Sequence, residues 1–180
     1  MAGFLFPKEY YDSTYSIDFQ RYYDMGYRGV LFDIDNTLVM HDYPSDENAI
    51  KLMERLKSIG FGICLVSNND EERVRTFNDY LKVEYIYKAD KPLAKGYKKA
   101  MKLLGTTTEN TIFVGDQLFT DIWGANNADI HSILVQPIDK HEEIQIVLKR
   151  IIEKPIIKLY LKNHSIQTKS IGGDRLADHR

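Results

Sequence analysis

The chain has 180 residues, of which 43% are hydrophobic and 28% are charged, as expected for one ordinary folded domain. Its net charge of −2 excludes a general electrostatic attraction to nucleic acid or anionic lipid. No apolar run approaches the roughly 18 residues of a membrane-spanning helix, and the N-terminus lacks the basic region of a secretory signal. A single cysteine, Cys64, excludes an internal disulfide and fits a reducing compartment, so we expect a cytoplasmic protein.

A tyrosine-rich segment opens the chain and includes a short predicted helix at 16–26, with Ser16 as its N-cap and Gly26 as its end. Five strands are predicted after it, because their residues are almost continuously apolar, as in strands buried on both faces. They span 29–34, 61–68, 83–88, 110–116 and 131–137. Helices are predicted between them by apolar residues that share one face. These span 44–60 with Ser45 as N-cap, 70–82, 93–105 with Gly105 as its end, and 119–128.

Strands that alternate with helices predict βαβ units and a parallel, doubly wound sheet. We therefore expect an α/β, Rossmann-like three-layer sandwich with a mostly parallel five-stranded sheet in residues 28–137. Residues 1–27 would form a helical N-terminal extension. Residues 138–180 would form a C-terminal helical tail, which Pro155 interrupts and which frays over its last dozen residues.

Polar residues stand at the ends of four consecutive predicted strands. They are Asp33 and Asp35, then Ser67, Asn68 and Asn69, then Lys88, Asp90 and Lys91, and finally Asp116, with Asp121 five residues later. In an open parallel sheet, ligands bind beyond the C-terminal ends of the strands. Each residue alone is most simply explained as a turn or cap residue, but their coincidence at one edge indicates a binding site.

Several carboxylates near one point repel one another unless a cation lies among them. Mg²⁺ suits such oxygen-rich sites and binds through one or two carboxylates together with a substrate phosphate. An EF-hand at 33–44 is excluded, because Leu38 replaces its glycine and Pro44 replaces its final glutamate. The chemistry that remains is phosphoryl transfer, in which a metal, a lysine and a hydroxyl hold the phosphate and a carboxylate attacks phosphorus.

Four motifs, in order, resemble those of the haloacid dehalogenase (HAD) superfamily of phosphatases over residues 28–136. DIDNT (33–37) looks like the first motif, DxDx[TV], and Ser67 looks like the second. Lys91 in KADKP looks like the third, and GDQLFTD (115–121) looks like the fourth. More narrowly, the chain resembles subclass IIIA, the YqeG-type group, which is related to mitochondrial phosphatidylglycerophosphate phosphatases.

The resemblance implies a role for each motif residue. Asp33 would be the nucleophile and a Mg²⁺ ligand. Asp35 would protonate the leaving oxygen and then activate water, and its backbone carbonyl would bind the metal. Asp116 would be the third protein ligand. The remaining expected site residues are Ser67, Asn68 and Lys91 for the phosphoryl group, and Asp121 and Thr37 as supports behind the metal ligands.

The short segments after the first two motifs leave no room for a cap domain over the site. Residues 38–60 hold one predicted helix before the second strand, and residues 68–90 hold one helix and one strand. We expect an open site, which suits bulky or macromolecular phosphorylated substrates. His41 and Asp42 either form a solvated loop or touch the substrate at the rim of the site.

The motifs favour a Mg²⁺-dependent phosphomonoester hydrolase that works through an aspartyl-phosphate. One alternative is a phosphatidylglycerophosphate phosphatase that makes peripheral membrane contact through GFLFPKEYY and RIIEKPIIKLYLKN. Another is a non-catalytic interaction module with a vestigial site. A third is a phosphotransferase, because the same residues could pass phosphate to an alcohol. Nothing in the sequence specifies an oligomeric state.

Overall fold

The structure is a computed structural model that describes residues 3–139 and 144–163. Six parallel strands form one sheet in the order β1-β6-β5-β2-β3-β4. The strands are β1 (Glu9–Tyr11), β2 (Gly29–Phe32), β3 (Gly62–Val66), β4 (Glu84–Ile86), β5 (Thr111–Gly115) and β6 (His131–Val135). The α-helices are α1 (Phe19–Asp24), α2 (Glu47–Ile59), α3 (Glu71–Asn78), α4 (Ala94–Leu104), α5 (Trp123–Asn127) and α6 (Ile144–Asn163).

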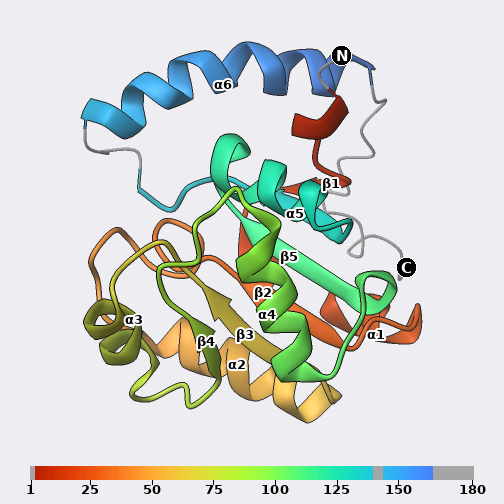
Figure 1. The fold of residues 1–180 in the computed structure, drawn as a ribbon, viewed down its shortest axis with the longest axis vertical. Helices are drawn as coiled ribbons and strands as arrows, with labels where there is room; N and C mark the ends of the chain where they lie inside the picture. Colours follow the sequence, from red (N-terminus) through yellow and green to blue (C-terminus); the bar gives the residue numbers. More distant parts are fainter. Residues whose placement is uncertain (1–2, 140–143, 164–180) are drawn as a thin grey trace, which may run out of the picture.

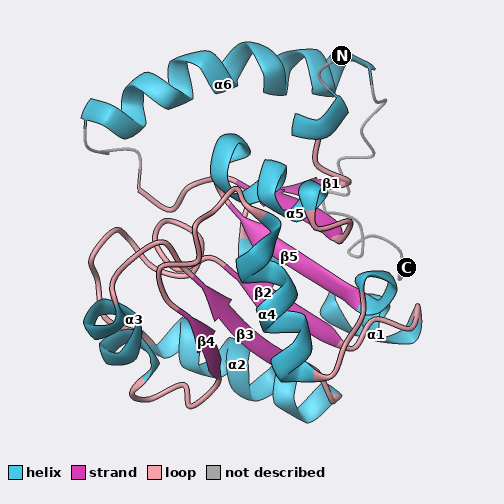
Figure 2. Ribbon diagram, in the orientation of Figure 1, coloured by secondary structure: helices cyan, strands magenta, loops and turns pink. Residues whose placement is uncertain are grey.

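Helices cover both faces of the sheet, as the sequence predicts for a three-layer α/β sandwich (Figures 1 and 2). Val30 and Phe32 of β2 belong to a core cluster that also contains residues of α1, α2 and α3. Leu31, between them, packs on the opposite face with residues of α4 and α5, such as Tyr97 and Ala125. This alternation along a fully buried strand explains why its sequence is apolar without a break.

The sequence predicts five strands, and the structure has a sixth, β1, inside the segment predicted as a helical extension. Residues Glu9 and Tyr11 pair with Ile133 and Val135 of β6, so β1 is a parallel strand at the edge of the sheet. A segment of three half-buried residues has no readable hydrophobic period. Its strand conformation depends on pairing with β6, which is distant in the sequence. Just before β1, the Lys8 N–H donates to the carbonyl of Ser132, 124 residues away, at 2.9 Å.

Two of the predicted helix caps are wrong by one or two residues. Asp46, rather than Ser45, caps α2 and accepts a hydrogen bond from the Ala49 backbone N–H at 2.8 Å. Asp18, rather than Ser16, caps α1. Gly105 ends α4 as predicted, with the left-handed backbone (φ 66°) that glycine tolerates at a helix end.

The predicted interruption at Pro155 is also wrong, because α6 continues through this residue to Asn163. A proline inside a helix removes one backbone hydrogen bond and costs about 3 kcal/mol. Packing of the turns that follow Pro155 offsets this cost: Ile156 and Ile157 contact the cluster around Leu118 and Ile122, and the Tyr160 ring lies 5.5 Å from that of Phe6. The predicted frayed end lies outside the described residues.

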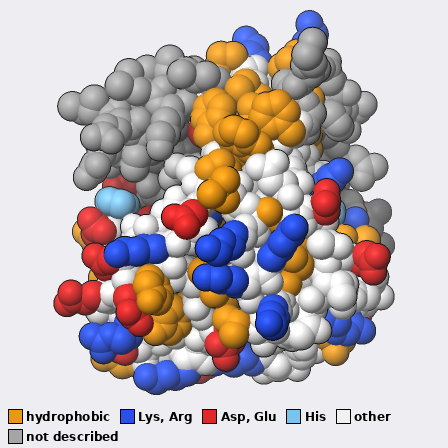
Figure 3. All heavy atoms as spheres, viewed as in Figure 1, with side chains coloured by type: hydrophobic (Ala, Val, Ile, Leu, Met, Phe, Trp, Pro, Cys, Tyr) orange, Lys and Arg blue, Asp and Glu red, His pale blue; other side chains and the backbone are white. Residues whose placement is uncertain are grey.

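The surface over α4 is basic. Figure 3 shows Lys and Arg side chains gathered on this face, where α4 exposes Lys95, Lys98, Lys99 and Lys102. None of the helices in the described ranges is long and apolar enough to cross a membrane. The two segments where a cap domain could insert hold only α2 in one, and α3 and β4 in the other, so the fold is cap-free as predicted.

Candidate active site

The end of β2 delivers the first two aspartates to the C-terminal edge of the sheet. The Asp33 backbone N–H donates to the Val114 carbonyl at 3.0 Å, which continues the pairing with β5 by one residue. The chain then turns sharply, because Asn36 adopts a left-handed backbone (φ 62°) and Leu38 N–H donates back to the Ile34 carbonyl. This turn leaves the Asp33 carboxylate buried at the strand end and carries Asp35 away from it.

Strand β5, which pairs with β2, brings the fourth motif. Asp116 follows β5 directly, and Asp121 lies in a short π-helical turn, η4 (Leu118–Ile122). A side chain at Gly115 would clash with Asp121, because an added Cβ would lie 2.6 Å from its carboxyl group. The glycine of the motif therefore makes room for the second aspartate.

These residues form a compact charged cluster. Asp33, Asp116 and Asp121 each offer a carboxylate oxygen, and the three oxygens lie within 4.8 Å of one another. The Lys91 ammonium group lies 2.6 Å from Asp33 Oδ1 and 2.7 Å from Asp121 Oδ1. Thr37 donates to Asp116 Oδ1 at 3.2 Å. All five side chains are buried, so water screens these charges weakly.

Three carboxylates and one ammonium leave a formal charge of −2 in a buried space. Burial raises the pKa of Asp33 to about 7, and the neighbouring Asp121 charge adds to this, although Lys91 opposes it. Burial would lower the pKa of Lys91, but Asp121 and Asp33 outweigh it and hold that pKa above its usual range. The excess negative charge and the close oxygen donors fit a divalent cation.

Asp121 is held in the cluster by hydrogen bonds to both of its carboxylate oxygens. One of its oxygens accepts from Lys91 at 2.7 Å, and the other accepts from the Gln117 backbone N–H at 3.0 Å. Both oxygens of Asp121 thus have protein donors. The expected metal ligands, which are Asp33, the Asp35 carbonyl and Asp116, stay a prediction.

Hydrogen bonds hold the backbone of Lys91 as well as its ammonium group. The Asn68 side chain accepts from the Lys91 N–H at 2.8 Å and donates to the Lys91 carbonyl at 3.2 Å. Asn68 therefore positions the Lys91 backbone, and its expected contact with phosphate stays a prediction. Ser67 is buried beside it and accepts from the Asn69 N–H at 3.2 Å. Lys88, which the sequence places at the same strand end, is exposed.

Asp35 lies outside the cluster, in a setting that the sequence does not predict. Its carboxylate accepts from Arg73 Nη2 at 2.8 Å and from the Asp42 backbone N–H at 3.0 Å, both at Oδ1. Asn69 donates to Oδ2. The His41 ring lies 3.9 Å from the same carboxylate, and its side chain is 38% exposed. Its expected contact with substrate stays a prediction. Sequence reasoning misses Arg73, in the first turn of α3, and notes Asn69 only as a residue at a strand end. Only the fold shows that both side chains point to Asp35.

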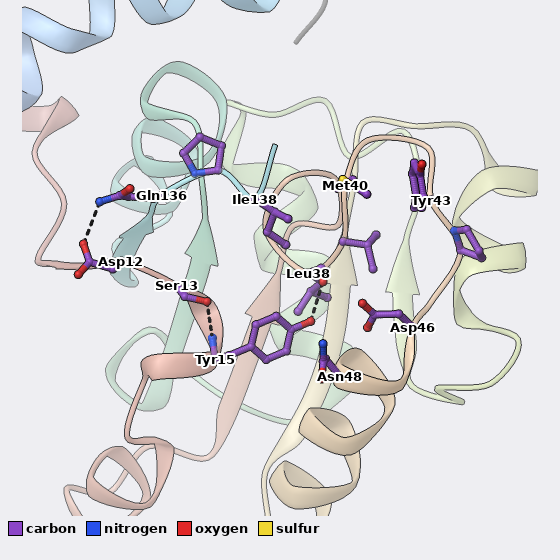
Figure 4. Close-up of a pocket in the computed structure, with 13 residues that line it drawn as sticks. Asp12, Ser13, Tyr15, Leu38, Met40, Tyr43, Asp46, Asn48, Gln136 and Ile138 are labelled. Carbon is purple, nitrogen blue, oxygen red and sulfur yellow. Dashed lines mark hydrogen bonds between the residues drawn. The ribbon is translucent and has the colours of Figure 1, made fainter. Parts of the chain in front are cut away.

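The loop that follows the first motif also lines a pocket of about 430 Å³ (Figure 4). Tyr15 reaches across to this loop and donates to the Leu38 carbonyl at 2.6 Å. Asp12 and Gln136, which hydrogen-bond to each other at 2.8 Å, also line this pocket, as does Ile138. The N-terminal segment, the loop and the residues after β6 thus form one hollow next to the turn that follows Asp33.

The model of the haloacid dehalogenase-like hydrolase family matches residues 40–129. A relative from Bacillus subtilis (strain 168), named probable phosphatase YqeG, is 32% identical over 168 residues, which cover 93% of this chain and 98% of that protein. The chain belongs to the haloacid dehalogenase-like hydrolase family. The resemblance to YqeG-type HAD phosphatases is thereby confirmed, and this HAD-like hydrolase is a phosphatase.

A second relative, from Arabidopsis thaliana, is named phosphatidylglycerophosphate phosphatase 1, chloroplastic/mitochondrial. It is 28% identical over 160 residues, which cover 81% of this chain but only 45% of the plant protein. Glyceraldehyde 3-phosphate phosphatase of Pyrococcus furiosus is 27% identical over 120 residues, covering 62% of this chain and 50% of that protein.

Solved structures share the fold of this HAD-like hydrolase. A protein from Listeria monocytogenes serotype 4b aligns with a TM-score of 0.52 at 19% identity, over 76% of this chain and 99% of that chain. The cobalt-bound deoxy-D-mannose-octulosonate 8-phosphate phosphatase of Haemophilus influenzae aligns with a TM-score of 0.51 at 15% identity, over 79% and 94%. These likenesses concern the fold alone.

Proposed function

We propose that this HAD-like phosphatase is a Mg²⁺-dependent phosphomonoester hydrolase that works through an aspartyl-phosphate on Asp33. The supporting observation is the contact of 2.6 Å between the Lys91 ammonium and the Asp33 carboxylate inside a cluster of three buried carboxylates. A phosphate substrate is itself anionic, so this cluster can bind it only if cations balance the charge of the carboxylates. Asp33 and Asp116, with the Asp35 carbonyl, would hold Mg²⁺, which would neutralise charge on the phosphoryl oxygens.

In the first half of the proposed reaction, an Asp33 oxygen attacks phosphorus. The bond from phosphorus to the leaving oxygen breaks, and that oxygen receives a proton from Asp35. In the second half, Asp35 takes a proton from water, whose oxygen attacks phosphorus and frees Asp33. Lys91 and Ser67 hold the phosphoryl oxygens in both halves, with Lys91 supplying positive charge where negative charge develops.

Asp33→Asn tests this function, because an amide is a poor nucleophile and has lost its charge. We expect the release of inorganic phosphate from p-nitrophenyl phosphate to need Mg²⁺ and to fall by about 10³-fold or more in the variant. Asp79→Asn, an exposed position at the end of α3, is the matched control and should retain full activity. Equal residual rates for the wild-type protein and Asp33→Asn would overturn the proposal.

A narrower candidate is hydrolysis of phosphatidylglycerophosphate in a membrane. Its support is the 28% identity with the plant phosphatase of that name and a fold without a cap domain over the site. The same assay decides it when the substrate panel includes phosphatidylglycerophosphate in vesicles beside soluble phosphomonoesters. A higher kcat/KM on the lipid supports this candidate. Activity on soluble esters with none on the lipid would remove it and leave the phosphatase proposal intact.

A further inference from the structure

The carboxylate of Asp35 is held more firmly than a turn residue requires. Three donors reach it from three places: the Arg73 guanidinium at 2.8 Å, the Asn69 amide at 2.5 Å and the Asp42 backbone N–H at 3.0 Å. The Asp35 and Arg73 side chains are only 13% and 16% exposed, so solvent screens their ion pair weakly. Side-chain oxygens that merely stabilise a turn usually accept one backbone N–H.

Arg73 is itself fixed at both ends. Asp70, the N-cap of α3, accepts from the Arg73 backbone N–H at 2.9 Å, which sets where the side chain leaves the helix. Arg73 Nη2 also donates to the Tyr43 carbonyl at 2.9 Å, whereas its Nε makes no hydrogen bond among the described residues and lies 3.7 Å from an Asp42 oxygen. The guanidinium therefore joins α3 to the loop that follows the catalytic turn.

The donors are shared unequally between the two oxygens of Asp35. Oδ1 accepts from Arg73 and from the Asp42 N–H, so both of its lone pairs are in use. Oδ2 accepts only from Asn69, among the described residues, and keeps one lone pair for a proton. The carboxylate thus has a defined orientation with one oxygen committed to structure and one able to exchange a proton.

We infer that Arg73 is a positioning residue for proton transfer, which holds the Asp35 carboxylate so that its Oδ2 meets the leaving oxygen. The inference rests on the proposed function, in which Asp35 is the proton donor. As Asp33 attacks, the bond from phosphorus to the leaving oxygen breaks, and its electron pair takes the proton from Asp35 Oδ2. The Arg73 Nη2 group keeps Oδ1 in place while Oδ2 loses the proton and later regains one from water.

Comparison of two leaving groups tests this role. Nitrophenolate leaves p-nitrophenyl phosphate without a proton, whereas an alkoxide such as that of glycerol phosphate leaves well only when protonated. A positioning defect therefore lowers kcat/KM on the alkyl ester far more than on the aryl ester. We expect Arg73→Gln to lower it by about 10²-fold on glycerol phosphate and by a few-fold on p-nitrophenyl phosphate. We use kcat/KM because it reports only the steps up to and including the departure of the leaving group.

One control and further variants accompany Arg73→Gln. Arg75→Gln removes the same charge from an exposed position of α3 and should leave the ratio of the two kcat/KM values unchanged. Asn69→Ala removes the donor to Oδ2 while the guanidinium stays, and it should show the same preference for the aryl ester. If Arg73→Gln does not fold, Arg73→Lys replaces it, because it keeps the positive charge but loses the guanidinium geometry and should show the same preference for the aryl ester.

The outcomes separate this inference from the proposed function. If Asp35→Asn lowers kcat/KM equally on both esters, Asp35 is not the proton donor and the proposed role of Asp35 fails. If Asp35→Asn spares the aryl ester but Arg73→Gln lowers both esters equally, or neither, Arg73 does not position Asp35 and the inference is overturned. A loss confined to the alkyl ester in both variants supports it.

Discussion

At the residue scale, Asp33 shows how a side chain placed for the site can lower the stability of the folded protein. Its carboxylate is buried next to Asp116 and Asp121, and Lys91 balances only part of their charge. Burial and the Asp121 charge raise the pKa of Asp33 to about 7, well above that of an aspartate in an unfolded chain. The group that would attack phosphorus is thus costly to ionise until a cation reaches the cluster.

This cost predicts a pH dependence of the free energy of unfolding. Because the pKa of Asp33 is higher in the folded protein, the folded state binds more protons between about pH 4 and pH 7. Its stabilising contribution is full below about pH 4 and is lost as the pH rises through about 7, a change on the order of 4 kcal/mol. Urea unfolding of the wild-type protein in EDTA should show this loss relative to Asp33→Asn, and added Mg²⁺ should reduce it. Parallel pH profiles for the two proteins would contradict the prediction.

Helix α2 shows at the element scale how neighbouring cap candidates are resolved. Ser45 and Asp46 both suit an N-cap, and the sequence favours the serine. The structure selects Asp46, whose side chain accepts from the Ala49 N–H, while the Ser45 hydroxyl is buried without a hydrogen bond among the described residues. A shift of one residue decides which of the two lies opposite the free N–H groups of the first turn.

Alanine at each of these two positions should have different effects. Asp46→Ala should lower the free energy of unfolding by about 1 kcal/mol, because one N–H of the first turn of α2 loses its acceptor. Ser45→Ala should be neutral or slightly stabilising, because it removes a buried hydroxyl that has no partner. Urea unfolding at constant pH compares the two, and a larger loss in Ser45→Ala would show that the cap is misassigned.

At the scale of the whole molecule, both ends of the described chain pack beside the catalytic edge. Glu153 of α6 is buried and accepts from the backbone N–H groups of Leu118 and Phe119, at 3.1 and 3.4 Å. These two residues begin the π-helical turn that carries Asp121. The rings of Phe4 and Trp123 lie 5.5 Å apart at the other end of this turn. Segments distant in the sequence therefore brace the loop that completes the cluster.

Glu153→Leu should lower the free energy of unfolding by about 1–3 kcal/mol, because two backbone N–H groups at the start of the turn lose their acceptor in a buried place. Glu153→Gln keeps an acceptor oxygen and should lose less. Trp123 is the only tryptophan of the chain and directly follows the turn, so its fluorescence reports the change during unfolding. Equal stability of the leucine variant and the wild-type protein would show that α6 does not hold the turn.

The sequence by itself determined the layers of the sheet and the acids at its edge. Uninterrupted apolar runs such as that of β2 occur in strands buried on both faces, and this predicts a parallel sheet with helices on either side. Parallel strands bring their C-terminal ends to one edge, so the sequence predicts that Asp33, Lys91 and Asp116 meet there. These inferences succeed because each depends on local periodicity and on one rule of topology.

Only the tertiary structure decided the features that depend on distant partners. Strand β1 exists through its pairing with β6, and α6 passes through Pro155 because its neighbours pack on the body of the protein. The bond from Arg73 to Asp35 joins residues 38 positions apart, and nothing in either segment specifies it. Side-chain direction at the start of a helix follows from where that helix docks, and docking energy comes from the whole core.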